Sequence, residues 1–377
     1  MLVSPEKLSR GETVRRILAG MAAALLAAIL LLPMECKAIS ASSYVLLDAT
    51  TGRVLQQHNA DKRKLIASTT KIMTALVVCE RCNVLDRVRI PKEAVGIEGS
   101  SMYLKEGEIL TVQELLYGLM LHSGNDAAVA LAIYCGGTVE GFAQLMNDKA
   151  YLLGLENTHF VNPNGLDAPN HYSTAKDMAR LSAYAMDNPI FAMTVSTKNV
   201  NVGSRVLKNH NKLLWQLDGA DGIKTGYTKA AGRILVSSAC RNGRRLICVT
   251  MDAPDDWNDH KNLLNSGFQD YTVQRVINSG QRIGSLEVVG GEKSTVALLA
   301  AEDLSVCLAT GEQVDVVMPT KMFDFAPVVE GECAGNATVM LGESVIGYVK
   351  LVYGDTVEQE SGISGSFWSK LFKGDAL

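Results

Sequence analysis

The run Ala67-Ser68-Thr69-Thr70-Lys71 leads into the apolar residues of 72–76 and places a hydroxyl and an amine three residues apart. The apolar spacing after Lys71 predicts a helix. Because positions i and i+3 share one face of a helix, the amine of Lys71 can reach the hydroxyl of Ser68. An amine that removes the hydroxyl proton turns serine into a nucleophile toward a carbonyl. Ser68 and Lys71 are therefore a candidate nucleophile and base.

Two further motifs lie downstream, in the places that such a site needs. Ser123-Gly124-Asn125 interrupts helical periodicity between two helical runs, which predicts a loop that projects polar side chains. Lys224-Thr225-Gly226 lies in a strand-like run. Each motif alone is a weak signal, but a nucleophile helix, a loop between helices and a strand in this order form a specific set.

The order of the predicted elements favours an α/β sandwich between residues 39 and 279. Residues 43–57 are typical of two strands around a Thr51-Gly52 turn, and residues 221–252 of three adjacent strands. A sheet built from both ends of this region, with helices between, is the expected architecture. The predicted helices cover 72–82, 111–120, 127–134, 139–153, 174–186 and 256–268.

Beyond about Gly280 the pattern changes to six short alternating runs separated by glycine and acidic turns, which predict a small all-β domain at 280–355. Residues 356–377 begin as a Ser/Gly linker. The tail then places four apolar side chains on one helical face, which predicts either an interfacial membrane anchor or a disordered apolar tail. These four side chains are Phe367, Trp368, Leu371 and Phe372.

The first 38 residues have the pattern of a secretory signal peptide. Four basic residues between Lys7 and Arg16 precede an uncharged apolar run at 17–32, and Cys36-Lys37-Ala38 suits cleavage after Ala38. An uncleaved anchor is the alternative, although the run is short for a membrane span. The expected location is outside the cytoplasm, at the outer face of the membrane, in the cell wall or in the periplasm.

The composition and net charge of the chain limit the classes of molecule that it can bind. The chain has 377 residues, 47% of them hydrophobic, and a formal net charge of −4. Its leader carries more basic than acidic residues, so the remainder is more acidic still, which argues against nucleic acid as a partner. No metal and no cofactor is expected.

The cysteines do not predict a disulfide framework, because an odd number follows the leader. Cys79-x-x-Cys82 allows a redox or zinc interpretation, but a structural zinc needs four ligands, and two cysteines at a helix end are favoured. Cys240 and Cys248 flank Asn242-Gly243, a hairpin signal. With a two-residue turn, Cys248 faces Ser237 and not Cys240.

The three motifs make the chain resemble the secreted D-alanyl-D-alanine carboxypeptidases, the low-molecular-mass penicillin-binding proteins. The resemblance spans about residues 40–352. It implies a β-lactamase/transpeptidase-like sandwich, in which a helical cluster covers an antiparallel sheet, followed by the small all-β domain. Supporting matches lie at Ala67–Leu76, Asn162–Leu166, Tyr172–Ala179, Asn209–Leu214 and Asp221–Thr228.

The resemblance implies a hydrolase that removes the terminal D-alanine from peptidoglycan stem peptides and is acylated by β-lactams. Ser68 would form the acyl-enzyme, and Lys71 would be its neutral base, with a pKa lowered by burial and by a nearby cation. Ser123 would relay a proton to the leaving D-alanine. Asn125 would bind the substrate backbone or hold Lys71.

The third motif would bind the substrate. Lys224 would face the terminal carboxylate, and Thr225 would add a hydroxyl donor. Gly226 would let the substrate lie against the strand as an added β-strand. The backbone N–H groups of Ser68 and Tyr227 would form the oxyanion hole.

The chain departs from the family pattern at two places. Asn164 stands where some relatives carry histidine. The stretch 253–260, where some relatives have an arginine for the carboxylate, contains none. His122, beside the second motif, is interpreted as a packing residue.

Two other functions remain open at this stage. A serine β-lactamase shares the acylation machinery, but no Glu-x-x-Leu-Asn follows Ser123 to supply a deacylating carboxylate. A penicillin-binding sensor would be acylated at Ser68 without turnover.

Overall fold

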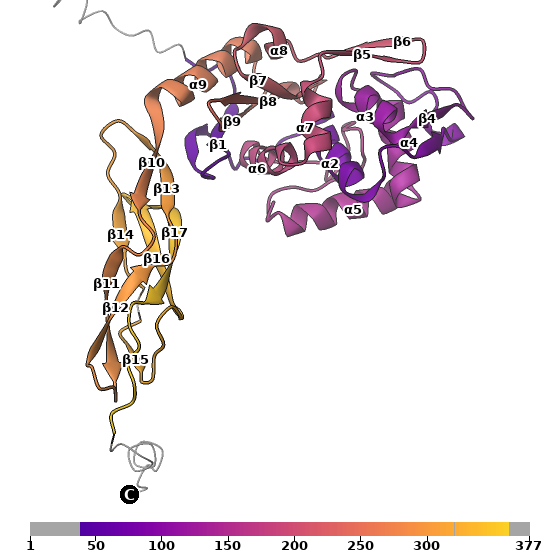
Figure 1. Cartoon of the computed structure of the whole chain (residues 1–377). Coiled ribbons are helices and arrows are strands. Elements are labelled where there is room, and N and C mark those ends of the chain that lie inside the picture. Colours follow the sequence, from indigo (N-terminus) through magenta and orange to yellow (C-terminus); the bar gives the residue numbers. More distant parts are fainter. Residues whose placement is uncertain (1–37, 320, 362–377) are drawn as a thin grey trace, which may run out of the picture. The chain divides into compact units, whose positions relative to one another are not determined.

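The computed structural model describes residues 38–319 and 321–361 (Figure 1). The predicted signal peptide, apart from Ala38, and the apolar residues of the predicted tail lie outside the described residues. Within them, no single helix is long and apolar enough to cross a membrane. One pair of consecutive helices has the required length and apolar composition together, but the two helices are bent by 82° relative to each other.

A five-stranded antiparallel sheet forms the centre of the first region, as predicted. Its order is β2-β1-β9-β8-β7, so β1 lies between β2 and β9, and Ser43 pairs with Met251. Segments about two hundred residues apart in the sequence therefore pair in one sheet. The strands are β1 (Ser43–Asp48), β2 (Val54–His58), β7 (Ala220–Thr228), β8 (Gly232–Arg241) and β9 (Arg244–Met251).

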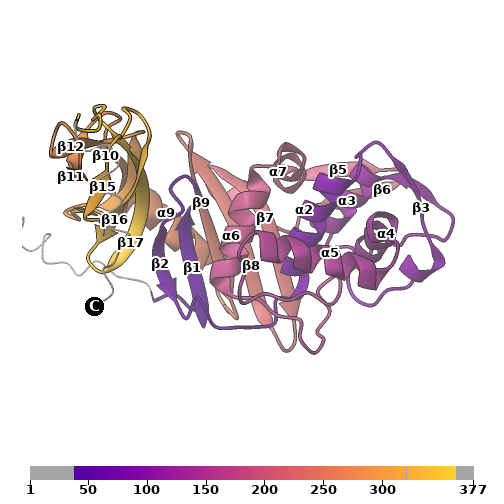
Figure 2. The same ribbon diagram turned by 90° about the horizontal axis from the view of Figure 1, so that it is seen from below.

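Helices cover both faces of this sheet (Figure 2). Helix α9 (Asp256–Asp270) packs on β8 and β9, while α6 (Ala175–Met186) packs on β1 and β9 from the opposite side. Helix α2 (Lys71–Arg81) is buried along nearly its whole length, which makes it the centre of the helical cluster. The cluster also contains α3 (Val112–Met120), α4 (Asn125–Gly136) and α5 (Val139–Leu152).

Hydroxyl side chains define where several helices begin. Thr111 and Glu114 form a reciprocal capping box at the start of α3. Thr174 accepts a hydrogen bond from the Asp177 N–H at the start of α6 and so caps this helix.

Several short elements were not predicted. They are two small hairpins and two short helices, each too short for its periodicity to stand out. These elements are β3 (Arg87–Arg89) with β4 (Ile109–Thr111), β5 (Asn199–Val202) with β6 (Arg205–Lys208), α7 (Pro189–Ser196) and α8 (Leu213–Gln216).

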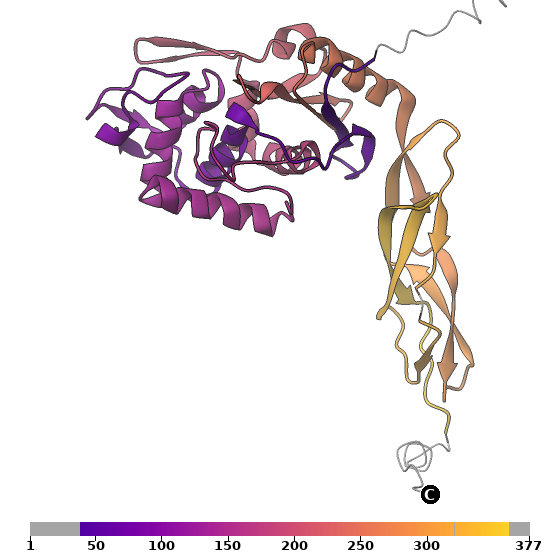
Figure 3. The same ribbon diagram turned by 180° about the vertical axis from the view of Figure 1, so that it is seen from behind.

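The strands after Tyr271 form the predicted all-β part (orange and yellow in Figure 3). A six-stranded sheet has the order β14-β16-β17-β12-β11-β15, and β10 pairs separately with β13. Strands β10 and β15 were not predicted. The strands are β10 (Tyr271–Ile277), β11 (Arg282–Val289), β12 (Thr295–Ala300), β13 (Leu304–Ala309), β14 (Asp315–Val317), β15 (Phe323–Phe325), β16 (Cys333–Leu341) and β17 (Ser344–Tyr353).

The pairing of β10 with β13 bears on the domain boundary. Tyr271 lies opposite Ala309, so β10 belongs with the later strands although it precedes residue 280. The boundary at 279 stays a prediction, and this pairing favours one before Tyr271.

The cysteines lie as the sequence analysis proposed. Helix α2 ends at Arg81 with Cys82 as its cap residue, and all seven cysteines of the described residues are free. Cys248 pairs with Ser237 and Arg241 with Arg244, which confirms the register of the hairpin. In the described part of the chain, no three His, Cys, Asp or Glu side chains gather closely enough to hold a metal ion.

Candidate active site

Ser68 lies in a short 3₁₀ turn, Ala67–Thr70, that leads directly into α2. Lys71 is the first residue of α2, and its Nζ lies 2.9 Å from the Ser68 Oγ. The predicted contact between the nucleophile and its base is therefore formed.

The surroundings of Lys71 decide its protonation. Its side chain is fully buried, and burial lowers its pKa well below the usual range, with the nearby Lys224 adding to the effect. Its Nζ donates to the Asn125 Oδ1 at 2.7 Å and to the Asn164 carbonyl oxygen at 2.5 Å. A neutral amine has only two N–H groups, and these two acceptors use both. The lone pair is then left for the hydroxyl proton of Ser68.

The loop that carries Asn164 is held against the nucleophile turn. Gly165 has φ +87°, and a Cβ there would lie 1.8 Å from the carbonyl oxygen of Ala67. The hydroxyl of Thr74 donates to the Pro163 carbonyl at 2.6 Å. Sequence reasoning missed this carbonyl contact because the backbone of Asn164, not its side chain, holds Lys71.

A buried histidine fastens the same loop. The Val161 N–H donates to the His171 Nδ1 at 3.1 Å, so the proton of the ring lies on Nε2, which donates to the Thr70 Oγ1 at 2.8 Å. Burial lowers the pKa of His171 to about 4, which keeps the ring neutral near neutral pH. No motif in the sequence marked His171.

Ser123 lies in the turn between α3 and α4, with φ +63°. Asn125 and Asp126, which follow Ser123, hold this turn by hydrogen bonds. The Asn125 Nδ2 donates to the Glu98 carbonyl at 2.5 Å, and the Asp126 carboxylate accepts the N–H groups of Met102 at 3.0 Å and Leu104 at 3.1 Å. The turn is thereby tied to the segment 98–104.

Lys224 is almost fully buried on β7, with 1% of its surface exposed. Its Nζ donates to the Ser123 Oγ at 3.1 Å and to the Thr225 carbonyl at 2.8 Å. Burial lowers the pKa of Lys224 to about 7. Ser123 is therefore in contact with a cation that titrates near neutral pH.

The structure requires glycine at position 226 for a reason that the sequence analysis did not give. A Cβ at this position would lie 3.2 Å from the Thr69 N and 3.3 Å from the Ser68 N, closer than side chains normally pack. The glycine therefore lets β7 approach the backbone of the nucleophile turn. Because β7 is the last strand of its sheet, one edge is free to pair, and Tyr227 beyond it is 67% exposed.

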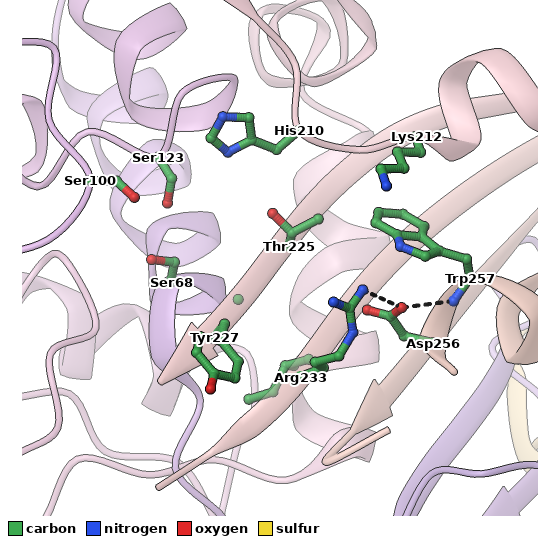
Figure 4. Close-up of a pocket in the computed structure, with 12 residues that line it drawn as sticks. Ser68, Ser100, Ser123, His210, Lys212, Thr225, Tyr227, Arg233, Asp256 and Trp257 are labelled. Atoms are coloured by element: carbon green, nitrogen blue, oxygen red, sulfur yellow. Dashed lines mark hydrogen bonds and ion pairs between the residues drawn. The ribbon is translucent and has the colours of Figure 1, made fainter. Parts of the chain in front are cut away.

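A cavity of about 350 Å³ opens above Ser68 (Figure 4). It brings together five predicted residues: Ser68, Ser123, Thr225, Gly226 and Tyr227. Lys71, Asn125 and Lys224 are buried and are not among the lining residues. Lys71 contacts Ser68, and Lys224 contacts Ser123 and Thr225. Lining residues that were not predicted are Ser100, His210, Lys212, Arg233, Ile234, Asp256 and Trp257.

His122 packs against another histidine, with its ring centroid 5.3 Å from that of His210. It lines a neighbouring cavity and not the one above Ser68.

The pKa of Lys224 gives a testable pH dependence. Acylation of Ser68 by penicillin should slow as the pH rises through about 7, because Lys224 then loses the proton that it shares with Ser123. Stability should change in the opposite direction. The unfolded chain, with an ordinary lysine pKa, binds more protons than the folded chain above pH 7, so this group makes the free energy of unfolding rise with pH in that window.

Acylation rates with a fluorescent penicillin and unfolding midpoints, both measured between about pH 5 and 10, test this expectation. The Lys224→Met variant should lose the slowing of acylation and show a smaller rise of the free energy of unfolding with pH. The rise should not vanish, because burial also lowers the pKa of Lys71. An acylation rate of the wild type that stays constant through neutral pH would contradict the assignment.

Comparisons with known proteins show the family to which the chain is similar. A family model described as D-alanyl-D-alanine carboxypeptidase matches residues 32–255, and one described as penicillin-binding protein 5, C-terminal domain, matches residues 271–359. The chain is 35% identical to the D-alanyl-D-alanine carboxypeptidase DacA of Haemophilus influenzae over 350 residues, which cover 88% of this chain and 89% of that protein.

Other similar proteins belong to the same family. The D-alanyl-D-alanine carboxypeptidase DacF of Bacillus subtilis is 35% identical over 312 residues, 78% of this chain and 80% of that protein. The crystal structure of penicillin binding protein 5 from Haemophilus influenzae is similar with a TM-score of 0.74 at 33% identity. That similarity covers 85% of this chain and 98% of the solved chain.

Proposed function

Because this chain belongs to the D-alanyl-D-alanine carboxypeptidase family of serine peptidases, we propose that Ser68 and Lys71 carry out its hydrolysis of D-Ala-D-Ala ends. The observation that carries the proposal is the 2.9 Å contact between the Lys71 Nζ and the Ser68 Oγ, at an amine whose two N–H groups already have acceptors.

In the acylation step, the hydroxyl proton of Ser68 passes to the lone pair of Lys71 while the Oγ attacks the carbonyl between the two D-alanines. The oxyanion forms beside the N–H groups of Ser68 and Tyr227. The close approach of Gly226 to the Ser68 N supports this pairing, because it brings β7 beside the nucleophile turn.

In the departure of D-alanine, the hydroxyl of Ser123 protonates the leaving amine. Lys224, 3.1 Å away, replaces that proton. The proton that Lys71 took from Ser68 passes on to the nearby Lys224, which restores both lysines. Water then attacks the acyl ester on Ser68, with a neutral Lys71 again available as base. Asn125 keeps Lys71 in position throughout, since its Oδ1 accepts from the amine at 2.7 Å.

The substrate is a peptidoglycan stem peptide that ends in D-Ala-D-Ala, and β-lactams acylate the same serine. The free edge of β7 can accept the peptide as an additional strand. The proposed location is outside the cytoplasm, with residues 1–38 as the export signal. The tail at 356–377, with its apolar residues between Phe367 and Phe372, is proposed to contact the membrane surface.

The test compares wild type with Ser68→Ala. A diacyl peptide ending in D-Ala-D-Ala is incubated with each, and free D-alanine is measured. Penicillin labelling is followed by intact mass. We expect release and labelling by wild type and neither by the variant. Labelling without release would favour a sensor, and rapid hydrolysis of penicillin would favour a β-lactamase.

A further inference from the structure

The cation predicted to face the substrate carboxylate is not in the wall of the cavity. Lys224 is 1% exposed, and its ammonium is bonded to the Ser123 Oγ and the Thr225 carbonyl. Among the described residues, the basic side chains that do line the cavity are His210, Lys212 and Arg233. The binding of an anionic substrate end must therefore be sought among these three.

Arg233 lies close to the hydroxyl predicted to bind that anion. It pairs with Tyr227 across β8 and β7, and Thr225 pairs with Leu235, so Arg233 and Thr225 are diagonal neighbours on one face of the sheet. Diagonal neighbours have Cα atoms about 7–8 Å apart, within reach of a long side chain. A carboxylate bonded to the Thr225 hydroxyl is thus within reach of the Arg233 guanidinium.

A buried acid orients the guanidinium. The Arg233 Nη2 donates to the Asp256 Oδ1 at 2.7 Å, and the side chains are 44% and 4% exposed, respectively. The same Oδ1 accepts the N–H of Trp257 at 2.9 Å, at the first turn of α9 (Figure 4). Within the described chain, the Nε and Nη1 of Arg233 have no hydrogen-bond partner, so donors remain for a ligand.

The other two basic residues fit the role less well. Lys212 is exposed, and its Nζ lies 5.9 Å from the centroid of the Trp257 ring without an acidic partner among the described residues. A lysine offers a flexible point charge, whereas the planar fork of arginine matches a carboxylate with two parallel bonds. His210 is exposed, but desolvation of its ring, together with the nearby Lys224, lowers its pKa to about 4, so the ring is uncharged near neutral pH.

We propose that Arg233, oriented by Asp256, binds the terminal carboxylate of the substrate and the carboxylate of penicillin. The proposal rests on the proposed function and adds a specificity-determining residue to it. The stretch 253–260 lacks the arginine that some relatives use there, but it supplies the acid that holds an arginine from the neighbouring strand.

The test asks whether the effect of Arg233 depends on the carboxylate. We compare kcat/KM for a diacyl peptide ending in D-Ala-D-Ala with that for the same peptide as a C-terminal amide. Arg233→Ala should lower kcat/KM on the acid by about 10- to 100-fold, the size of a bond to a charged group. On the amide it should change by less than about twofold, so the preference for the acid disappears.

Penicillin and its methyl ester form a second arm, read as the acylation rate of Ser68. This arm does not depend on peptide turnover. If the wild type is acylated but releases no D-alanine, the proposed function is wrong, yet the acylation rates still test the role of Arg233. Arg233→Lys should keep part of the preference for the acid. Asp256→Asn should reduce the same preference as a positioning residue, with a larger change in KM than in kcat.

The matched control is Arg245→Ala, which removes another Arg–Asp pair of 2.7 Å, with Asp221, from the adjacent strand and outside the cavity. It should leave the preference for the acid unchanged. An equal loss on acid and amide in Arg233→Ala, or no loss on either, would overturn the proposal.

Discussion

Replacing Lys71 by alanine is expected to slow the acylation of Ser68 by penicillin by about 10³-fold, the contribution typical of a well-placed general base. The reason is that Lys71 is the group in contact with the Ser68 Oγ that can take its proton. Alanine also leaves the Asn125 Oδ1 and the Asn164 carbonyl without their donor, which should cost stability. Stopped-flow labelling and thermal unfolding measure the two effects.

A second lysine provides the control for Lys71. Lys149 on α5 is also largely buried, and its Nζ forms an ion pair of 2.6 Å with Glu80 far from the cavity. Lys149→Ala should lower the unfolding temperature without slowing acylation. A Lys71→Ala protein that folds and keeps more than about a tenth of the wild-type rate would show that another group is the base.

Gly165→Ala is expected to inactivate the enzyme although it adds one methyl group outside the cavity. The new Cβ would lie 1.8 Å from the Ala67 carbonyl oxygen, and φ +87° is itself unfavourable for alanine. The loop must move away from the nucleophile turn, and this movement breaks the hydrogen bond between the Lys71 amine and the Asn164 carbonyl. A displacement of about 1 Å can cost 10²-fold in rate, so we expect a loss of at least that size.

Gly154→Ala separates backbone strain from the clash. Gly154 has φ +64°, but a Cβ there meets nothing within 4 Å. Both variants should lose stability through the left-handed backbone, by about 1 kcal/mol or more. Only Gly165→Ala should also lose acylation. Equal acylation rates in the two variants would refute the role of this loop in holding Lys71.

Much of the fold followed from local patterns. The strands around Thr51 and those between residues 220 and 251 are apolar runs bounded by turn residues, although β8 and β9 are buried on both faces and do not alternate. Helices α3 and α6 begin at side-chain caps, whereas α2 and α4 have none. Strand β10 was missed because most of its side chains are exposed, so it shows no buried face. Helix α7 spans only two turns, too few for a period to be recognised.

The site was predicted where side chains act and missed where the backbone or the tertiary fold acts. Ser68, Ser123 and Lys224 belong to motifs with fixed spacing. The Asn164 carbonyl has no side-chain signature. Arg233 and Asp256 come together only because β8 and the start of α9 meet in space, and nothing in their sequence spacing indicates a pair.

The position of β1 within the sheet sets an order of events during synthesis. Its partner β9 ends at Met251, so β1 leaves the ribosome long before the strand that covers its inner edge. At about 5–20 residues per second, some 10–40 s separate the two strands. Until then the growing chain cannot complete this sheet, and α6 has no finished surface to pack on. The sheet of the nascent protein is therefore completed only after almost the whole catalytic region has been synthesised.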